Sequence, residues 1–554
     1  MTEKPRLRII PLGGLGEIGM NMMVYEYGDS IIVVDCGLMF PDDSMLGIDL
    51  VIQDISYLKR NKDKVKAFVI THGHEDHTGS LPFVLREINA PIYGTALTLG
   101  LIKAKLEEFN LLNETVFETV RPRDVVSIGP FTIEFIRVSH SIVDGVALAI
   151  KTPVGVVIHT GDFKFDQTPV DGEVTDYARF ADYGEKGVLA LLSDSTNVEK
   201  EGYTLSERVI GQALEEIFAK CPGRIIVAAF SSNIHRIQQV FDVSEKLGKV
   251  VMLNGRSMVG NAKIARNLGY LKASDSLIAD IKELDEIPAK NAVILTTGSQ
   301  GEPMSALTRM AMNNHKQIKI IKGDTVILSA KFIPGNEKTI ANMMNHLFRR
   351  GADVIYEKVS EIHVSGHASQ EELKIMLNMV KPKYFVPIHG EYRHLVQHAR
   401  LARTTNVAGE NVFIMENGDV LELGEKGAGM KEKVERGKVF VDGKGVGDVS
   451  DMVLKDRRHL SQDGMVIAIV ALNQNTGEVV YGPDIITRGL IFEEEGGSLM
   501  LEAKAVVNET LNAINTEAKG EILEVNEEVR RALRRFYNKV LDRKPVILPL
   551  IIEL

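Results

Sequence analysis

Three histidines and one aspartate lie within six positions of this 554-residue chain: His72, His74, Asp76 and His77. They follow an apolar run at 65–70, which predicts a buried strand that ends in a loop. Alternating residues of such a loop point the same way, so His72 and His74 can bind one metal ion, while Asp76 and His77 turn toward a second. Imidazole nitrogen and carboxylate oxygen suit Zn²⁺ or a similar first-row metal, and the lack of Cys here argues against a closed structural zinc site. The alternative is a solvated histidine-rich turn.

Further polar residues close other predicted strands, namely His140, Asp162, Asp194 and His389. A lone His after a strand is more often a satisfied hydrogen-bonding residue than a metal ligand. Because ligands of α/β proteins collect outside strand ends, we expect these residues to share one sheet edge with the histidine cluster. Asp162 has two carboxylate oxygens and could bridge two metal ions. The sequence therefore predicts a two-metal site with an open position for hydroxide.

Two segments have the pattern of an anion site. Ser369 and Glu372 indicate a capping box that opens a helix at about 370–380, and free N–H groups at such a helix start favour phosphate. The segment FSSNIHR at 230–236 repeats the order of strand, small polar turn and helix. The residues at these junctions are Ser365, Gly366 and His367, and Ser231, Ser232 and Asn233. Ordinary helix capping is the alternative for each segment taken alone.

The charge balance opposes a general nucleic-acid-binding protein. The chain has 65 Lys and Arg against 75 Asp and Glu, a net charge of −10 with His neutral. Nonspecific nucleic-acid binding normally depends on a basic surface. We therefore expect acidic residues on the outer faces, with Lys and Arg lining any cleft between the first domain and the insertion described below.

The composition is that of a soluble globular protein. Two cysteines, Cys36 and Cys221, cannot form a disulfide framework and favour a reducing compartment. No signal peptide is visible, and no apolar run approaches the roughly 20 residues of a membrane span. The prediction is a cytoplasmic protein without a membrane partner.

Alternation of apolar strands and helical patterns predicts an α/β protein with an insertion. The predicted divisions are a first domain at 1–205, an inserted α/β domain at 206–362, the return of the first domain at 363–424, a Gly- and Lys-rich linker with one short strand at 425–450, and a small α+β domain at 451–554. A hairpin is expected in the last domain, with its turn at Asn475, Thr476 and Gly477. Four arginines on one later helix, Arg530, Arg531, Arg534 and Arg535, indicate a solvated face or a subunit contact more than an RNA contact.

The motif HxHxDH, a strand-end His and the Gly-Asp at 161–162 together resemble the metallo-β-lactamase superfamily. Asp194 in SDST, His367 in SGHAS and His389 in PIHGE resemble its β-CASP branch. The segments PLGGLGEIGMN, FSSNIHR, GSQGEP and ILPLIIEL resemble the bacterial ribonuclease J family over essentially the whole chain. The resemblance implies a metallo-β-lactamase αββα sandwich interrupted by a β-CASP domain, plus a C-terminal domain.

The resemblance also implies roles for individual residues. One metal ion would be held by His72, His74 and His140, and the other by Asp76, His77 and His389, with Asp162 bridging them. His367, oriented by Asp194, is the expected general acid, and His367 as a simple phosphate ligand is the competing interpretation. Asp35 is expected behind the metal ligands, or as a strand-end residue satisfied by backbone. The implied pocket for an RNA 5′-monophosphate consists of Ser231, Ser232, Asn233, His363, Val364, Ser365, Gly366 and His367.

The implied activity is hydrolysis of single-stranded RNA with two divalent ions, Zn²⁺ or Mn²⁺. It would combine 5′–3′ exonuclease action on 5′-monophosphate ends with endonuclease action, in mRNA decay and rRNA maturation. Implied partners are a second copy or three further copies of the chain, bound through the C-terminal domain, and other RNA-decay proteins. The alternatives are a small-molecule metallo-hydrolase of the same superfamily and a catalytically silent RNA-binding scaffold.

Overall fold

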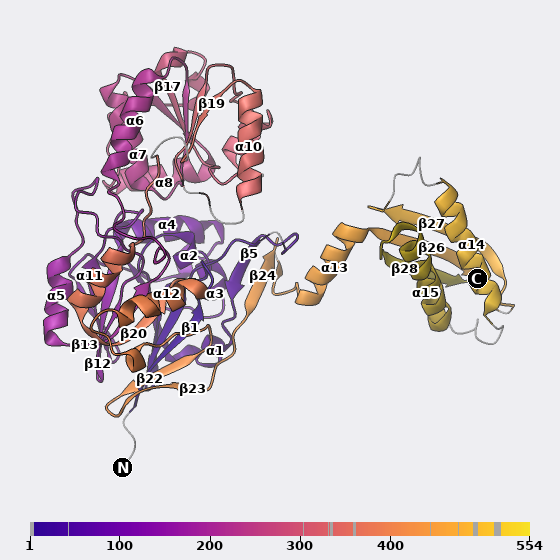
Figure 1. Ribbon diagram of the computed structural model, residues 1–554, viewed down its shortest axis with the longest axis horizontal. Helices are drawn as coiled ribbons and strands as arrows, with labels where there is room; N and C mark the ends of the chain where they lie inside the picture. Colours follow the sequence, from indigo (N-terminus) through magenta and orange to yellow (C-terminus); the bar gives the residue numbers. More distant parts are fainter. Residues whose placement is uncertain are drawn as a thin grey trace. The chain divides into compact units, whose positions relative to one another are not determined.

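The computed structural model describes residues 5–42, 44–302, 304–330, 332, 336–357, 362–443, 445–474, 476–490, 497–514 and 522–554. The chain forms two compact units (Figure 1). The first unit contains Met1–Phe40 and Leu50–Val439, and the second contains Pro41–Asp49 and Phe440–Leu554. Each unit is described by itself below.

A sandwich of two sheets forms the lower part of the first unit in Figure 1. The larger sheet has the order β23 (Gly427–Lys431), β22 (Val420–Gly424), β1 (Leu7–Gly13), β3 (Met22–Tyr27), β4 (Ser30–Val34), β6 (Val65–Val69), β7 (Ile92–Gly94) and β8 (Phe117–Thr119). The second sheet has the order β20 (Pro382–Ile388), β13 (Val188–Asp194), β12 (Gly155–His159), β11 (Val146–Thr152), β10 (Phe131–Arg137) and β9 (Val125–Ile128). Each sheet therefore combines strands that precede the inserted domain with strands that follow it.

The two sheets pack face to face because alternate residues of their strands are apolar and point inward. Tyr25, Val69, Phe135 and Leu192 belong to one buried cluster that joins the two inner faces. The outer face of the larger sheet is covered by α1 (Ser56–Arg60), α3 (Leu81–Val84) and α4 (Ala96–Glu108). The outer face of the second sheet is covered by α5 (Tyr177–Lys186), α11 (Gln370–Val380) and α12 (Tyr392–Arg403). The result is the predicted αββα arrangement.

The inserted domain is a six-stranded parallel sheet with helices on both faces (Figure 1). Its strand order is β16 (Ile278–Ala279), β15 (Val250–Asn254), β17 (Ala292–Thr296), β14 (Ile225–Ala228), β18 (Thr325–Leu328) and β19 (Asp353–Ile355). One face packs against α6 (Arg208–Lys220), α7 (Ile234–Lys246) and α8 (Arg256–Asn267), and the other against α9 (Ala306–Ala311) and α10 (Glu337–Arg349). Both faces are buried, which explains why these strands read as continuous apolar runs.

The second unit is built on the sheet β27 (Val479–Arg488), β26 (Met465–Leu472) and β28 (Val546–Glu553). The helices α14 (Gly497–Ala513) and α15 (Ile522–Leu541) cover one face of this sheet, and α13 (Asp451–Asp463) precedes it. β26 and β27 pair antiparallel, as the predicted hairpin requires. Of its expected turn residues, Asn475 lies outside the described part of the chain.

The segment 425–450 differs from the expected linker with one short strand. It carries three strands, β23, β24 (Lys438–Asp442) and β25 (Gly445–Val446). β23 extends the larger sheet of the sandwich by pairing antiparallel with β22, and each of its five residues has a partner in that strand. Among the described helices, none combines the length and apolar character needed to cross a lipid bilayer.

Candidate metal centre

Five strand ends meet at one edge of the sandwich, and they come from both sheets. β6 leads into the loop with His72 and His74 and into α2 (Glu75–Thr78), which carries Asp76 and His77. The second sheet contributes the residues that follow β10, β12, β13 and β20. The prediction that one sheet edge carries the whole site is therefore wrong. The larger sheet carries only the histidine cluster after β6, and the facing edge of the second sheet carries His140, Asp162, Asp194 and His389.

The first half-site contains His72, His74, His140 and Asp162. The Nδ1 atom of His74 lies 3.1 Å from Nε2 of His72 and 3.2 Å from Nε2 of His140. The Oδ2 atom of Asp162 lies 3.6 Å from Nε2 of both His72 and His140. All four ligand atoms lie within 4.8 Å of one another.

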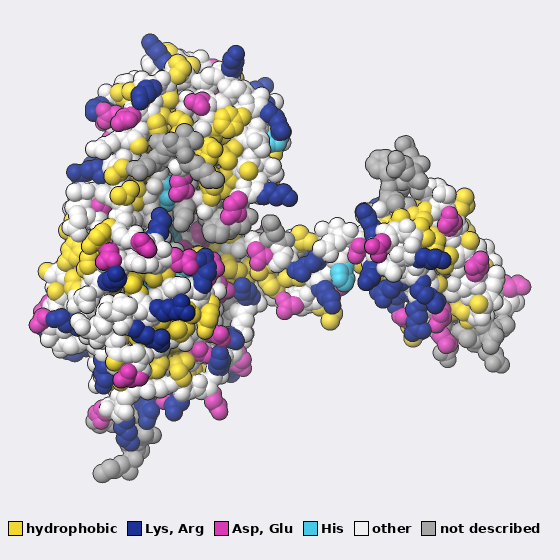
Figure 2. All heavy atoms as spheres, in the orientation of Figure 1, with side chains coloured by type: hydrophobic (Ala, Val, Ile, Leu, Met, Phe, Trp, Pro, Cys, Tyr) yellow, Lys and Arg dark blue, Asp and Glu magenta, His cyan; other side chains and the backbone are white. Residues whose placement is uncertain are grey.

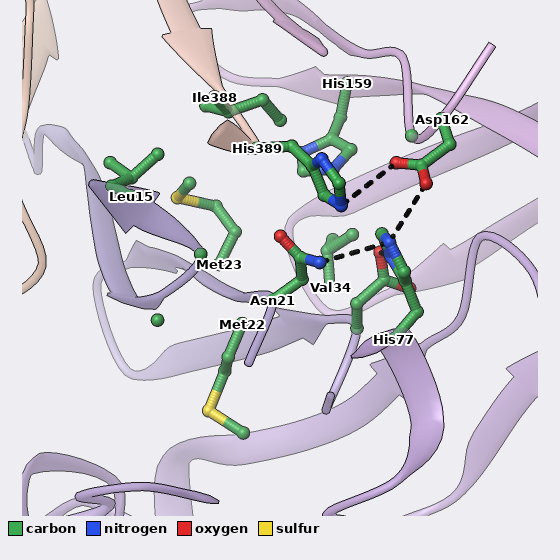
Figure 3. Close-up of a pocket in the computed structure, with 14 residues that line it drawn as sticks. Leu15, Asn21, Met22, Met23, Val34, His77, His159, Asp162, Ile388 and His389 are labelled. Atoms are coloured by element: carbon green, nitrogen blue, oxygen red, sulfur yellow. Dashed lines mark hydrogen bonds and ion pairs between the residues drawn. The ribbon is translucent and has the colours of Figure 1, made fainter. Parts of the chain in front are cut away.

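The second half-site contains Asp76, His77 and His389, and it shares Asp162 with the first. Oδ2 of Asp162 lies 3.4 Å from Nε2 of His77, and Oδ1 lies 3.7 Å from Nε2 of His389 (Figure 3). Oδ2 of Asp76 lies 3.6 Å from Nε2 of His77 and 3.3 Å from Nε2 of His389. Asp162 therefore stands between the two groups of ligand atoms, which is the position predicted for a bridging carboxylate.

The outer nitrogen of four histidines is anchored, which turns the inner nitrogen toward the site. Nδ1 of His77 donates to Asp35 at 2.8 Å, and Nδ1 of His140 donates to the Gly366 carbonyl at 2.7 Å. Nδ1 of His72 lies 3.1 Å from the hydroxyl of Thr71, whose own N–H donates to Asp35. Nδ1 of His389 lies 2.5 Å from the hydroxyl of Thr196. Asp35 thus contacts His77 and Thr71 on the side away from the candidate metal position.

The donor set fits divalent metal ions. The Oδ1 atom of Asp162 is buried and has no hydrogen-bond partner among the described residues. Burial lowers the pKa of His74 to about 4, so this imidazole is neutral and keeps a lone pair at neutral pH. Burial opposes the charged form of His389, yet Asp162 and the bond to Asp76 raise its pKa to about 9. Carboxylates that recruit a proton in this way are suited to exchange it for a cation.

His367 and Asp194 form a pair beside the metal ligands. Nδ1 of His367 donates to Oδ2 of Asp194 at 2.8 Å, and the same nitrogen lies 3.9 Å from Asp162. The His367 side chain is one-fifth exposed, whereas Asp194 is buried. Burial lowers the pKa of His367, but the charge of Asp194 outweighs it and the pKa is raised. This pair can hold a proton at Nε2 next to the metal ligands.

The turn 231–233 lies where predicted, at the start of α7. The Asn233 side chain caps this helix by accepting the N–H of Arg236 at 3.0 Å. Ser232 stands in the same turn, and its carbonyl accepts the N–H of Ile234. The Ser231 hydroxyl accepts a hydrogen bond from Asn261 at 3.2 Å.

The segment 363–367 precedes α11 and its predicted capping box, which is confirmed for Ser369 and Glu372. The prediction of free N–H groups at this helix start is wrong. Gln370 and Glu371 donate their N–H groups to the carbonyls of Lys200 and Gly202. The Val364 side chain packs in the core of the inserted domain, so only its backbone can face a ligand. The Ser365 hydroxyl accepts the N–H of His367 at 3.2 Å, and His363 is half-buried.

Two residues that support the site were not predicted. The amide of Asn21 donates to the carbonyl of Asp76 at 3.0 Å and lies 3.1 Å from Nε2 of His77 (Figure 3). It lines a small pocket beside the second half-site. Thr196 anchors His389 as described above. Both residues lie in the quoted segments PLGGLGEIGMN and SDST, but no spacing rule links them to the distant histidines.

The expected basic lining between the first domain and the insertion is not found in the large cavity there. Four Lys and Arg line it (Arg121, Arg137, Lys164 and Lys272) together with seven carboxylates (Asp144, Asp166, Asp171, Glu173, Glu207, Asp242 and Glu245). Several carboxylates are paired, such as Asp171 with His235 at 3.0 Å. Figure 2 shows acidic and basic side chains intermixed over the visible face of the first unit.

Four family models match successive parts of the chain. They are the Metallo-beta-lactamase superfamily at residues 15–199, the Ribonuclease J beta-CASP domain at 222–347, the Zn-dependent metallo-hydrolase RNA specificity domain at 351–415 and the Ribonuclease J C-terminal domain at 452–554. The predicted α/β class, with an interrupted metallo-β-lactamase fold, is thereby confirmed.

Curated relatives match over almost the full length. Ribonuclease J 1 of Streptococcus pyogenes serotype M3 is 44% identical over 98% of this chain and 97% of its own length. Ribonuclease J2 of Bacillus subtilis is 41% identical, over 99% and 98%, and Ribonuclease J of Thermus thermophilus is 42% identical, over 99% and 95%. A solved structure of a protein of unknown function from Enterococcus faecalis V583 shares the fold, with a TM-score of 0.54 and 16% identity over 76% of this chain and all of that one. By its motifs, its metal centre and these matches, the chain belongs to the ribonuclease J family of metallo-hydrolase nucleases.

Proposed function

We propose that this protein hydrolyses phosphodiester bonds of single-stranded RNA, as a 5′–3′ exonuclease that prefers 5′-monophosphate ends and also as an endonuclease. The observation that carries the proposal is the pair of half-sites joined at Asp162, with His367 and Asp194 beside them. Relatives that are named ribonuclease J support RNA as the substrate. The physiological roles would be mRNA decay and rRNA maturation in the cytoplasm.

The residues of the two half-sites would hold the metal ions, which we propose to be Zn²⁺ or Mn²⁺. His72, His74 and His140 would hold one ion, Asp76, His77 and His389 the other, and Asp162 both. Two such ions lower the pKa of water to near neutrality and neutralise charge on phosphate oxygens. Asp76 and Asp162 would contribute to catalysis by positioning these ions.

His367 would supply the proton that the leaving group needs. Attack of a water oxygen on phosphorus, with the water's proton released to solvent, would break the bond to the 3′ oxygen, and the proton on Nε2 of His367 would pass to that oxygen. Since Asp194 holds Nδ1, the proton-carrying Nε2 has a defined direction. The raised pKa of His367 favours the protonated form, which a general acid requires. The products are a 3′-hydroxyl end and a 5′-phosphate end.

The turn 231–233 and the segment 363–367 would bind the terminal phosphate. Hydroxyl and backbone N–H groups of small residues are suited to phosphate, and a terminal anchor near the metal ligands favours release of one nucleotide at a time. A 5′-triphosphate would not fit the same anchor. Internal cleavage requires a strand that bypasses it.

The test uses the purified chain with Zn²⁺ or Mn²⁺ and one single-stranded RNA prepared with a 5′-monophosphate or a 5′-triphosphate. Release of mononucleotides from the monophosphate RNA, lost in His77→Ala and His367→Ala, is the expected result. His459→Ala on the exposed face of α13 is the matched control and should retain the activity. Internal cleavage that does not depend on the 5′ end would support the nuclease activity but contradict the proposed binding of the terminal phosphate. Absence of cleavage with either metal would favour the scaffold or the small-molecule hydrolase.

We further propose that two or four copies of the chain assemble through the C-terminal unit and meet other RNA-decay proteins. The face of the sheet β27-β26-β28 away from α14 and α15 exposes Leu548, Leu550 and Ile552 to between 42% and 50%. Ile467 and Ile469 of β26 stand directly opposite Leu548 and Leu550 and extend this apolar face. An exposed apolar sheet face of this kind marks a protein interaction site.

A further inference from the structure

The buried Arg236 lies in the first turn of α7, three residues after Asn233, and the proposed mechanism does not use it. Its side chain is fully buried and pairs with the buried Glu207 at 2.8 Å. Taking a guanidinium and a carboxylate out of water is costly, and such a pair is weak evidence for added stability. Added stability therefore does not explain why Arg236 is buried at this position.

Arg236 joins segments that are far apart in the sequence. Nη1 donates to the carbonyls of Ile362 at 2.9 Å and Ser329 at 3.1 Å, and Nε donates to Gln239 at 3.1 Å. The Ser329 hydroxyl donates to the same Ile362 carbonyl at 2.7 Å. Ile362 immediately precedes the segment 363–367, so one side chain fixes the proposed phosphate segments to each other.

The same network extends through Glu207 to Asp166, close in sequence to the bridging carboxylate. The N–H of Glu207 donates to Asp166 at 3.0 Å, and its carbonyl accepts from Gln239 at 2.5 Å. Asp166 is four residues beyond Asp162, and it lies 3.5 Å from the buried Lys164. Buried polar contacts thus connect both phosphate segments to Asp166, which follows the bridging carboxylate by four residues of chain.

We propose that Arg236 is a positioning residue that sets the distance between the terminal-phosphate pocket and the metal centre. The planar guanidinium binds two carbonyls and one carboxylate in fixed directions, which a flexible ammonium group cannot reproduce. Arg236 itself does not touch the RNA. This inference rests on the proposed preference for 5′-monophosphate RNA.

The main variant is Arg236→Met combined with Glu207→Met, because removing both charges avoids leaving one of them buried and unpaired. We expect its kcat/KM ratio between 5′-monophosphate and 5′-triphosphate RNA to fall about tenfold to a hundredfold, mostly through KM, since misplacement by about 1 Å has effects of this size. The bound metal content should stay at the parent's value. Arg236→Lys keeps the buried pair charged. For this variant we expect the kcat/KM ratio between the two RNAs to fall as well, but by less than in the double variant.

The matched control is Arg224→Met with Asp324→Asn. Arg224 and Asp324 form a second pair at 2.6 Å in the same domain, but at the opposite ends of β14 and β18 from Ser329 and the turn 231–233. We expect the control to retain the parent's ratio. A folded double variant, or Arg236→Lys, with the parent's ratio would show that Arg236 is only a core residue. A parent without any preference would instead overturn the terminal pocket, so the two failures are distinguishable.

Discussion

At the scale of single residues, the metal centre depends on side chains that touch the ligands from behind. Asp35 has a backbone φ of 62°, a conformation that Asn and Asp tolerate better than most residues. This geometry lets one carboxylate accept the N–H of Thr71 and the Nδ1–H of His77 at once, at 2.8 Å each. Exchange of one oxygen for an amide nitrogen therefore leaves a single acceptor for these two donors.

We predict that Asp35→Asn lowers metal affinity by about tenfold to a hundredfold, the usual effect of losing a partner of a metal-binding histidine. The amide has one acceptor oxygen where the carboxylate has two, so it cannot accept from Thr71 and from Nδ1 of His77 at once, while the backbone retains its conformation. The measurement is the number of ions retained during dialysis against increasing concentrations of a chelator. Asp542→Asn is the control, because Asp542 also has a positive φ, of 50°, but lies in the second unit. Equal retention by parent and Asp35→Asn would contradict the prediction.

A second residue, His398, is not a candidate metal ligand, and it makes the folding stability depend on pH. It is fully buried beside Ser195 and Phe385, and burial lowers its pKa to about 3. The unfolded histidine has a pKa of about 6.5, so below this pH the unfolded chain binds a proton that the folded chain does not. Folding stability is therefore lost as the pH falls from 6.5 toward 3, by about 1.4 kcal/mol per unit.

We predict that His398→Asn flattens this loss, because Asn does not titrate and can still contact Ser195. Urea unfolding of parent and variant between pH 7 and pH 5 measures the difference in slope, which should correspond to about one proton. His459→Asn, at an exposed position, should follow the parent. Parallel curves for parent and His398→Asn would show that this histidine is not the buried neutral group described here.

At the scale of elements, the site depends on how closely the segment before α11 approaches the loop after β10. A Cβ atom added to Gly366 would lie 2.7 Å from Nδ1 and Cε1 of His140 and 2.9 Å from Cβ of Ser141. Contacts this short displace the imidazole ring. Glycine at this position is thus a requirement of two elements that pack against each other.

We predict that Gly366→Ala weakens metal binding at the first half-site and reduces RNA cleavage by at least about tenfold, since His140 loses both its position and its backbone acceptor. Elemental analysis and cleavage assays on the same preparation measure the two effects. Gly429→Ala in β23 is the control, because nothing lies within 4 Å of its Cβ position. Retention of full metal content in Gly366→Ala would argue against the tight contact.

At the scale of the whole molecule, the exposed apolar sheet face of the second unit is the proposed contact between copies of the chain. We predict that Leu548→Lys with Leu550→Lys turns an oligomer into a monomer, because charges on this face oppose its burial against a second copy. Sedimentation or light scattering measures the mass. Leu501→Lys with Leu523→Lys, at residues 70% and 82% exposed on α14 and α15, is the matched control. An unchanged mass in the first variant would place the contact elsewhere.

The sequence alone indicated the chemistry that we propose for this protein. The spacing of His72, His74, Asp76 and His77, with His140, Asp162 and His389 at later strand ends, indicated two metal ions and a bridging carboxylate. The capping pair Ser369 and Glu372 and the helices near 206–220 and 233–249 were likewise readable, because capping and periodicity are local properties of the chain.

Only the tertiary structure decided what lies between distant segments. The two-sheet origin of the site, the support from Asn21 and Thr196, and the use of the α11 N–H groups by Lys200 and Gly202 arise from contacts across tens to hundreds of residues. The large cavity is lined by carboxylates as well as by Lys and Arg, because folding brings these side chains together from distant segments. Composition and motif spacing carry no information on such contacts, since side-chain packing in three dimensions sets them.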